Sequence, residues 1–181
     1  MVSFSIFAHL SCRNELTHHA GWSFGGVLAF EIARQLQDLG TPVKGLILLD
    51  SPYQIDHEPL PDTIIEHIAG TAFGAHPDIR SCVAAQFKRN AGLLKNYKRP
   101  LGSFQVPTVM LLSREACDTA TLCGLKYAWL DDEDFRKMAT QMWTTLVGDK
   151  IETMDIDGNH FNMFEVKHVK LRYTSIKCCF Y

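Results

Sequence analysis

GWSFGGVLAFEIARQL, at residues 21–36, is the stretch of sequence that decides the fold of this chain. Its first residues follow the pattern G-x-S-x-G, and apolar residues then recur at helical spacing until Gly40 ends the run. This combination predicts a nucleophile elbow, a sharp turn from a buried strand into a helix that exposes a serine hydroxyl at the helix N-terminus. We therefore expect Ser23 to act as a nucleophile.

Apolar runs and helical patterns alternate along the rest of the chain. Three runs read as buried strands, at residues 43–50, 105–113 and 151–156. Helical patterns occur at residues 62–69, 79–97 and 131–146, whereas residues 114–130 read as a loop. Strands that alternate with helices predict an α/β fold, with a mostly parallel sheet flanked by helices.

The chain reads as one domain, residues 1–181, with three unusual segments. Residues 1–20 are an atypical lead-in, and residues 170–181 are an atypical tail. Between about residues 53 and 101 two prolines mark a loop and helical stretches follow it, which predicts an inserted helical lid over the site.

Three residues at predicted strand ends supply the chemistry that a serine nucleophile needs. A serine hydroxyl requires a base to accept its proton, and the base requires a third group to fix its tautomer. Asp50 ends the strand at residues 43–50, and His160 stands in a Gly-Asn-His turn after the strand at residues 151–156. The order serine, aspartate, histidine is that of the α/β-hydrolases.

The position of the acid has an alternative. Many α/β-hydrolases place this residue after the next strand, which makes Asp118 a rival to Asp50. We favour Asp50 because it terminates a strand directly, whereas Asp118 lies several residues into a loop. The backbone N–H of Phe24, which follows the nucleophile, is expected to donate to the oxyanion.

Composition excludes several classes of partner. Hydrophobic residues make up 46% of the chain, charged residues 21%, and the net charge is −2, so neither a nucleic acid nor a membrane is expected as a partner. The six cysteines show no C-x-x-C spacing and no metal-ligand pattern with histidine. We expect free thiols, no bound metal and a cytoplasmic location.

Three segments resemble one known family. GWSFGGVLAFEIARQL, LILLDSP and GNHFNMF, at residues 21–36, 46–52 and 158–164, are similar to the type I thioesterase domain at the end of polyketide and non-ribosomal peptide synthases. The fungal polyketide synthases, with their Claisen cyclase-type domains in the α/β-hydrolase superfamily, are the nearest in pattern. In that family the acid follows the strand directly after the elbow helix, which supports Asp50.

The resemblance implies a mechanism and a partner. An acyl or polyketide chain would arrive as a thioester on the phosphopantetheine arm of an acyl carrier protein, and the domain would need no cofactor of its own. Ser23 would attack the thioester with His160 as general base, and hydrolysis or cyclisation would release the chain. Lid residues would line an apolar chamber or pack between helices, namely Phe73, Phe87, Leu93, Leu94 and Tyr97.

The start of the chain departs from the family pattern. Only 22 residues precede Ser23, and the segment His18-His19-Ala20 fits a buried strand poorly. Such a short lead-in predicts an apolar sheet edge beside the elbow and leaves no room for a second oxyanion donor. One hypothesis is a fragment of a synthase thioesterase domain. Other readings are a stand-alone carboxylesterase-like hydrolase and an inactive truncated remnant.

Overall fold

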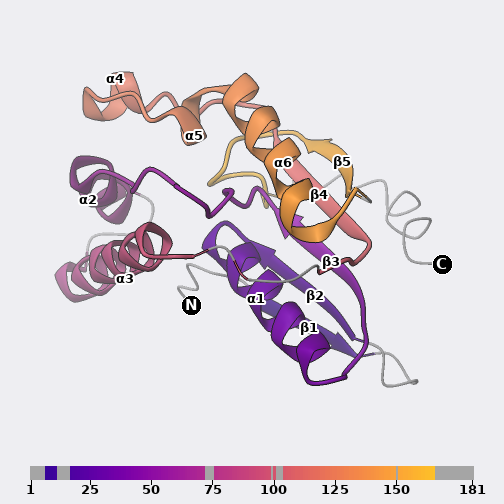
Figure 1. Ribbon diagram of the computed structural model, residues 1–181. Coiled ribbons are helices and arrows are strands. Elements are labelled where there is room, and N and C mark those ends of the chain that lie inside the picture. The colour runs from indigo at the N-terminus through magenta and orange to yellow at the C-terminus, as the bar shows by residue number, and fades with distance from the viewer. Residues whose placement is uncertain are drawn as a thin grey trace.

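A single mixed sheet organises the molecule, shown as a ribbon in Figure 1. The structure is a computed structural model, and it describes residues 7–11, 17–71, 76–98, 100, 104–149 and 151–165. The strands are β1 (Phe7–Ser11), β2 (Thr17–Trp22), β3 (Val43–Leu49), β4 (Thr108–Ser113) and β5 (Ile151–Ile156). They lie side by side in chain order, with β2 to β5 parallel and β1 antiparallel to β2. The predicted α/β class with a mostly parallel sheet is therefore confirmed.

Two long helices cover one face of this sheet (Figure 1). They are α1 (Phe24–Asp38), which joins β2 to β3, and α6 (Glu133–Val147), which joins β4 to β5. The segment between β3 and β4 contributes α2 (Asp62–Thr71) and α3 (Pro77–Lys95), which project beyond the end of the sheet. Two short helices, α4 (Thr119–Cys123) and α5 (Ala128–Asp131), follow β4.

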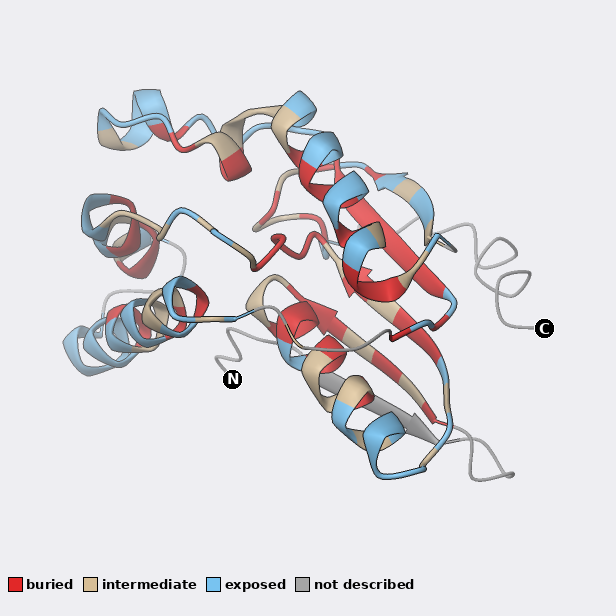
Figure 2. Ribbon diagram, viewed as in Figure 1, coloured by how far each residue is buried: buried red, intermediate tan, exposed pale blue. Residues whose placement is uncertain are grey.

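The core lies between the sheet and the two long helices (Figure 2). Alternate residues of a strand face opposite sides of a sheet. Leu46 and Leu48 of β3 therefore face this core, whereas Ile47 packs against a smaller cluster on the other side of the sheet. At the centre, the fully buried ring of Phe30 in α1 meets the ring of Trp143 in α6, with centroids 5.5 Å apart. This contact locks α1 and α6 together over the sheet.

The start of the chain differs from expectation. The segment His18-His19-Ala20, expected to fit a buried strand poorly, lies within β2, the strand that leads into the elbow. His19 is 1% exposed there, and its Nε2 lies 3.0 Å from the hydroxyl of Thr17, so the polar ring is buried with a hydrogen bond. The exposed edge expected beside β2 is also wrong, because β1 pairs with β2 along its whole length.

Helix boundaries after β4 also differ from the sequence pattern. Residues 114–130, expected as a loop, contain α4 and most of α5. The helix expected from residue 131 begins at Glu133, because the carboxylate of Asp132 accepts a hydrogen bond from the backbone N–H of Phe135 and caps the helix.

Some expectations fall outside the described residues. These are the structure of residues 1–6 and 12–16 in the lead-in, the tail at residues 170–181, and Phe73, Cys12, Cys178 and Cys179. Within the described ranges, Cys82, Cys117 and Cys123 are free thiols. Of the helices that can be described, not one has the length and apolar character needed to cross a membrane.

The packing at Phe30 generates a stability prediction. Phe30→Ala should lower the free energy of unfolding by about 3–5 kcal/mol, because the cavity opens at the contact between α1 and α6. Leu28→Ala, in the same helix at 38% exposure, should lower it by less than about 1 kcal/mol. Urea unfolding monitored by tryptophan fluorescence measures both, and equal losses would contradict the assignment of Phe30 to the central contact.

Candidate active site

Ser23 stands at the sharp turn between β2 and α1. Its backbone has φ 54° and ψ −128°, a conformation that a non-glycine residue rarely adopts. The N–H of Ser23 donates to the carbonyl of Leu49 at 2.9 Å, which ties the turn to the end of β3. A Cβ at Gly21 would collide with the carbonyl of Gly25, and one at Gly26 would collide with the side chain of Ser51. Gly21 and Gly26 are therefore required by close packing of strand and helix.

Asp50 follows β3 and is fully buried at 0% exposure. Its backbone N–H donates to the carbonyl of Leu111 at 2.7 Å, which ties the turn to β4. The carboxylate accepts two hydrogen bonds from Ser113 at the end of β4, one from the backbone N–H at 3.1 Å and one from the hydroxyl at 2.8 Å. A buried charge requires such partners, since its desolvation is otherwise uncompensated.

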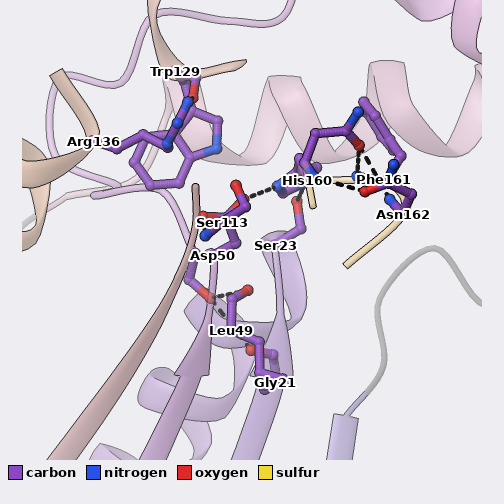
Figure 3. Close-up of polar contacts among 12 residues, drawn as sticks. Gly21, Ser23, Leu49, Asp50, Ser113, Trp129, Arg136, His160, Phe161 and Asn162 are labelled. Carbon is purple, nitrogen blue, oxygen red and sulfur yellow. Dashed lines mark hydrogen bonds and ion pairs between the residues drawn. The ribbon is translucent and has the colours of Figure 1, made fainter. Parts of the chain in front are cut away.

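His160 connects Asp50 to Ser23 (Figure 3). Its Nδ1 lies 2.7 Å from Oδ2 of Asp50, and its Nε2 lies 3.0 Å from Oγ of Ser23. The turn that carries the ring is held by two asparagines, because Oδ1 of Asn159 accepts from the N–H of Phe161 and Oδ1 of Asn162 accepts from the N–H of Asn159. His160 is 5% exposed, and its ring centroid lies 5.1 Å from that of Trp22.

Electrostatics assigns the proton on the imidazole. Burial alone would raise the pKa of Asp50, but the hydrogen bond and charge of His160 and the two bonds from Ser113 hold this pKa below its ordinary value. Asp50 is therefore an anion that only accepts hydrogen bonds, so Nδ1 of His160 carries the proton. Nε2 is left as an acceptor facing the hydroxyl of Ser23.

The structure brings together the three residues selected from the sequence, and it places the rival acid elsewhere. Asp118 caps α4 at the surface, where its carboxylate accepts from the N–H of Thr121. Ser113 was missed, although its position at the end of an apolar run was the available signal. Phe24 is the first residue of helix α1 and follows Ser23 directly.

A cavity of about 60 Å³ opens over Ser23 and His160, and we call it the serine cavity. Of the chamber residues expected from the sequence, Phe87 and Leu94 line it. Leu93 is instead 54% exposed, and the hydroxyl of Tyr97 donates to Glu31 of α1 at 2.9 Å. The remaining lining residues are Phe24, Pro52, His57, Leu60, Asn90, Ala91, Tyr127, Trp129, Leu130 and Phe161.

His57 also lines the serine cavity. Its Nε2 lies 3.0 Å from the hydroxyl of Tyr127, which also contacts the carbonyl of Glu58 at 2.6 Å. Burial lowers the pKa of His57 to about 4, so the ring is neutral near neutral pH. No local motif marks this residue, because its burial comes from the loop after β3 folding against Tyr127.

Metal ligation has no candidate in the described part of the chain, where no three His, Cys, Asp or Glu side chains gather in a suitable group. The chemistry that the site can perform is that of a buried Asp–His pair beside a serine hydroxyl. Such an arrangement deprotonates an attacking hydroxyl and reprotonates a leaving group.

Fold and site geometry together are those of an α/β-hydrolase type domain. Residues 18–173 match the family described as Thioesterase domain, and the chain belongs to this family. Among its relatives is an orsellinic acid synthase of Beauveria bassiana, 34% identical over 82% of this chain and 8% of the relative. The orsellinic acid synthase armB of Armillaria mellea is 36% identical over 82% of this chain and 7% of the relative. The chain thus spans less than a tenth of the length of these fungal polyketide synthases.

Solved structures give the same fold. The NocB thioesterase domain, in covalent complex with a fluorophosphonate nocardicin G analogue, matches with a TM-score of 0.58 and 21% identity, over 88% of this chain and 63% of that one. The RedJ thioesterase of Streptomyces coelicolor matches with a TM-score of 0.50 and 19% identity, over 80% of this chain and 53% of that one.

The buried imidazole of His57 predicts a pH dependence of stability. Since its folded pKa of about 4 is lower than the ordinary 6.5, the unfolded chain binds the proton first as the pH falls. Stability is therefore lost between pH 6.5 and about 4, by up to about 3 kcal/mol for this group. Urea unfolding across this range should show a shallower dependence for His57→Gln than for the wild type.

His76→Gln is the matched control, because this histidine is exposed. The two variants are compared with the wild type at each pH, which removes the contributions of other groups such as Asp50. Identical slopes in His57→Gln and the wild type would contradict a buried, neutral His57.

Proposed function

We propose that this chain is a serine thioesterase that cleaves an acyl thioester through an acyl-enzyme on Ser23. The observation that carries the proposal is the position of His160, within hydrogen-bond distance of both Ser23 and the buried Asp50. Membership of the thioesterase domain family supports a thioester as the substrate. Ser23 is the nucleophile, His160 the general base and Asp50 the residue that orients the base.

Acylation follows from the proton positions. Nε2 of His160 accepts the proton of Ser23 while Oγ attacks the thioester carbon, and the imidazolium that forms is stabilised by Asp50. The negative charge that develops on the carbonyl oxygen is stabilised by the N–H of Phe24, at the positive end of the α1 dipole. Collapse of the tetrahedral intermediate breaks the carbon–sulfur bond, and His160 returns the proton to the sulfur.

Deacylation releases the chain from Ser23. His160 again acts as base, either toward water or toward a nucleophile within the bound chain, which gives hydrolysis or cyclisation. The serine cavity surrounds the reacting atoms with residues that are all buried or half-buried. The relatives are named orsellinic acid synthases, which supports a polyketide as the acyl group and a carrier-protein phosphopantetheine thioester as its source.

The nucleophile is tested by substitution. Ser23→Ala should lower the hydrolysis of an acyl-N-acetylcysteamine thioester by about 10³-fold or more, because the attacking oxygen is lost. Ser81→Ala, at an exposed serine of α3, is the matched control and should retain the wild-type rate. A fluorophosphonate should label the wild type and Ser81→Ala, but not Ser23→Ala, as read by intact mass.

An ester substrate distinguishes this function from that of a carboxylesterase. Turnover of a p-nitrophenyl ester without turnover of the acyl-N-acetylcysteamine thioester would contradict the proposal. Absence of both turnover and fluorophosphonate labelling would contradict it as well, since the nucleophile would then be inactive.

Ser113 is proposed as a positioning residue for Asp50. Ser113→Ala removes the hydroxyl bond of 2.8 Å to a buried carboxylate, and a hydrogen bond to a charged group of this kind is worth roughly tenfold or more in rate. Without this donor Asp50 is more basic, and its interaction with the imidazolium is stronger. The acid limb of the kcat/KM profile should therefore move to higher pH.

Ser113→Thr keeps the hydroxyl and should restore both the rate and the profile. A slower Ser113→Ala variant with an unshifted acid limb would mean that Ser113 serves packing alone.

A further inference from the structure

One face of helix α3 lines the serine cavity. The residues that it contributes follow the pattern i, i+3, i+4, i+7, and they are Phe87, Asn90, Ala91 and Leu94. Three of these residues are apolar, and Asn90 is the polar one among them. Asparagine is ordinarily a surface residue, but Asn90 is 7% exposed. A polar side chain in a buried, apolar setting is costly unless its hydrogen bonds are made.

The amide of Asn90 is only partly satisfied within the protein. Its Oδ1 accepts a hydrogen bond of 2.8 Å from Nε2 of Gln86, which lies one helical turn earlier in α3. This bond fixes the orientation of the amide, because its oxygen is held on the side of Gln86. Its NH₂ group donates to no acceptor in the residues that the structure describes. Asn90 therefore leaves an unused donor at the wall of the serine cavity.

A second residue of the cavity wall also has an unused donor. The indole N–H of Trp129 is buried and has no hydrogen-bond partner in the described ranges of the chain. By contrast, the side chains of His57 and Tyr127 at the same wall are within hydrogen-bond distance of each other. The unused N–H groups of Asn90 and Trp129 call for a ligand that brings acceptor atoms into the cavity.

The carbonyl oxygen of the thioester does not supply this acceptor. In the proposed mechanism it lies at the N–H of Phe24 while Ser23 attacks its carbon. An acyl group that carries only carbon and hydrogen beyond this carbonyl would leave the NH₂ group of Asn90 unpaired in a buried setting. A keto or hydroxyl oxygen further along the acyl group supplies the missing acceptor.

We propose that Asn90 is a specificity-determining residue, whose NH₂ group donates to a keto or hydroxyl oxygen of the bound acyl group. It thereby favours oxygenated acyl groups over saturated ones of the same length. The inference rests on the proposed thioesterase function and names the residue that selects the acyl substrate. Sites built to bind a polar group reject analogues that lack it, because the polar atoms of the site are then left unpaired. This rejection gives the half-satisfied amide in α3 a function.

Paired substrates isolate the effect of the oxygen. The N-acetylcysteamine thioesters of 3-oxobutanoate and butanoate differ by one keto group, and so do those of 5-oxohexanoate and hexanoate. The selectivity of a pair is the kcat/KM of the oxo thioester divided by that of the saturated one. Asn90→Leu, which keeps a similar side-chain volume without the donor, should lower this ratio by about tenfold in at least one pair. Comparing the ratio between variants cancels the different intrinsic reactivities of the substrates.

Asn96→Leu is the matched control for this substitution. Asn96 is exposed at the C-terminal end of the same helix and does not line the serine cavity. This variant should keep the wild-type ratio in both pairs. Asn90→Leu should also unfold at the same urea concentration as the wild type or at a higher one, because it removes a buried donor that lacks an acceptor.

The kinetic outcomes separate specificity from packing and from failure of the proposed function. A lower ratio in Asn90→Leu, with the saturated thioesters turned over no more slowly than by the wild type, supports the proposal. An unchanged ratio in both pairs overturns it. Equal losses for both members of a pair, together with unfolding at lower urea, also overturn it, since Asn90 would then serve packing alone. Failure of the proposed function is distinct, because the wild type would show no Ser23-dependent turnover of any of the four thioesters.

Binding without turnover tests Asn90 independently of catalysis. In ¹⁵N-labelled Ser23→Ala protein, the side-chain NH₂ signals of Asn90 are those that disappear when Asn90→Leu is added. The 5-oxohexanoyl or the 3-oxobutanoyl thioester should move these signals downfield, as a new hydrogen bond to an acceptor does, whereas the saturated partners should not. The NH₂ signals of Asn96 serve as the internal reference. Asn90 signals that stay in place with both oxo thioesters, up to their solubility limits, would overturn the proposal.

Discussion

The buried carboxylate of Asp50 is the constraint on which the rest of the site depends. An anion at 0% exposure is tolerated only where hydrogen bonds replace the water it has lost. Ser113 donates two of these bonds from the end of β4, and His160 donates a third from the turn after β5. The charge thus ties three neighbouring strand ends together, and the imidazole has one orientation in which to meet Ser23.

Packing in the core holds the nucleophile elbow in its conformation. Ser23 holds a left-handed backbone, which costs on the order of 1–3 kcal/mol and persists only where packing enforces it. That packing comes from α1, which is pressed onto β2 and β3 and is held by the contact between Phe30 and Trp143. The indole N–H of Trp143 also donates to the carbonyl of Ser51, directly after Asp50. The packing of the core therefore also holds the geometry of the site.

Local patterns were sufficient to place Asp50, which ends an apolar strand, and His160, which stands in a Gly-Asn-His turn after a strand. Asp50 and His160 were predicted in this way, because parallel strands deliver their C-terminal ends to one edge of the sheet. The same logic failed for β2, where His19 interrupts the apolar pattern and is buried beside Thr17. Ser113 and His57 were not predicted from the sequence. The local sequence around a strand-end serine or a loop histidine is the same whether the side chain faces solvent or a buried partner.

The sequence by itself determined the α/β class, the elbow at Ser23 and the family to which the chain belongs. These depend on patterns within a few residues, such as glycines at a tight turn and helical spacing of apolar side chains. Tertiary structure alone decided that Asp50 rather than Asp118 reaches His160, that β1 covers the edge of β2, and that His57 lines the serine cavity. Such contacts join segments far apart in the chain, and which of them form depends on how the strands and helices pack.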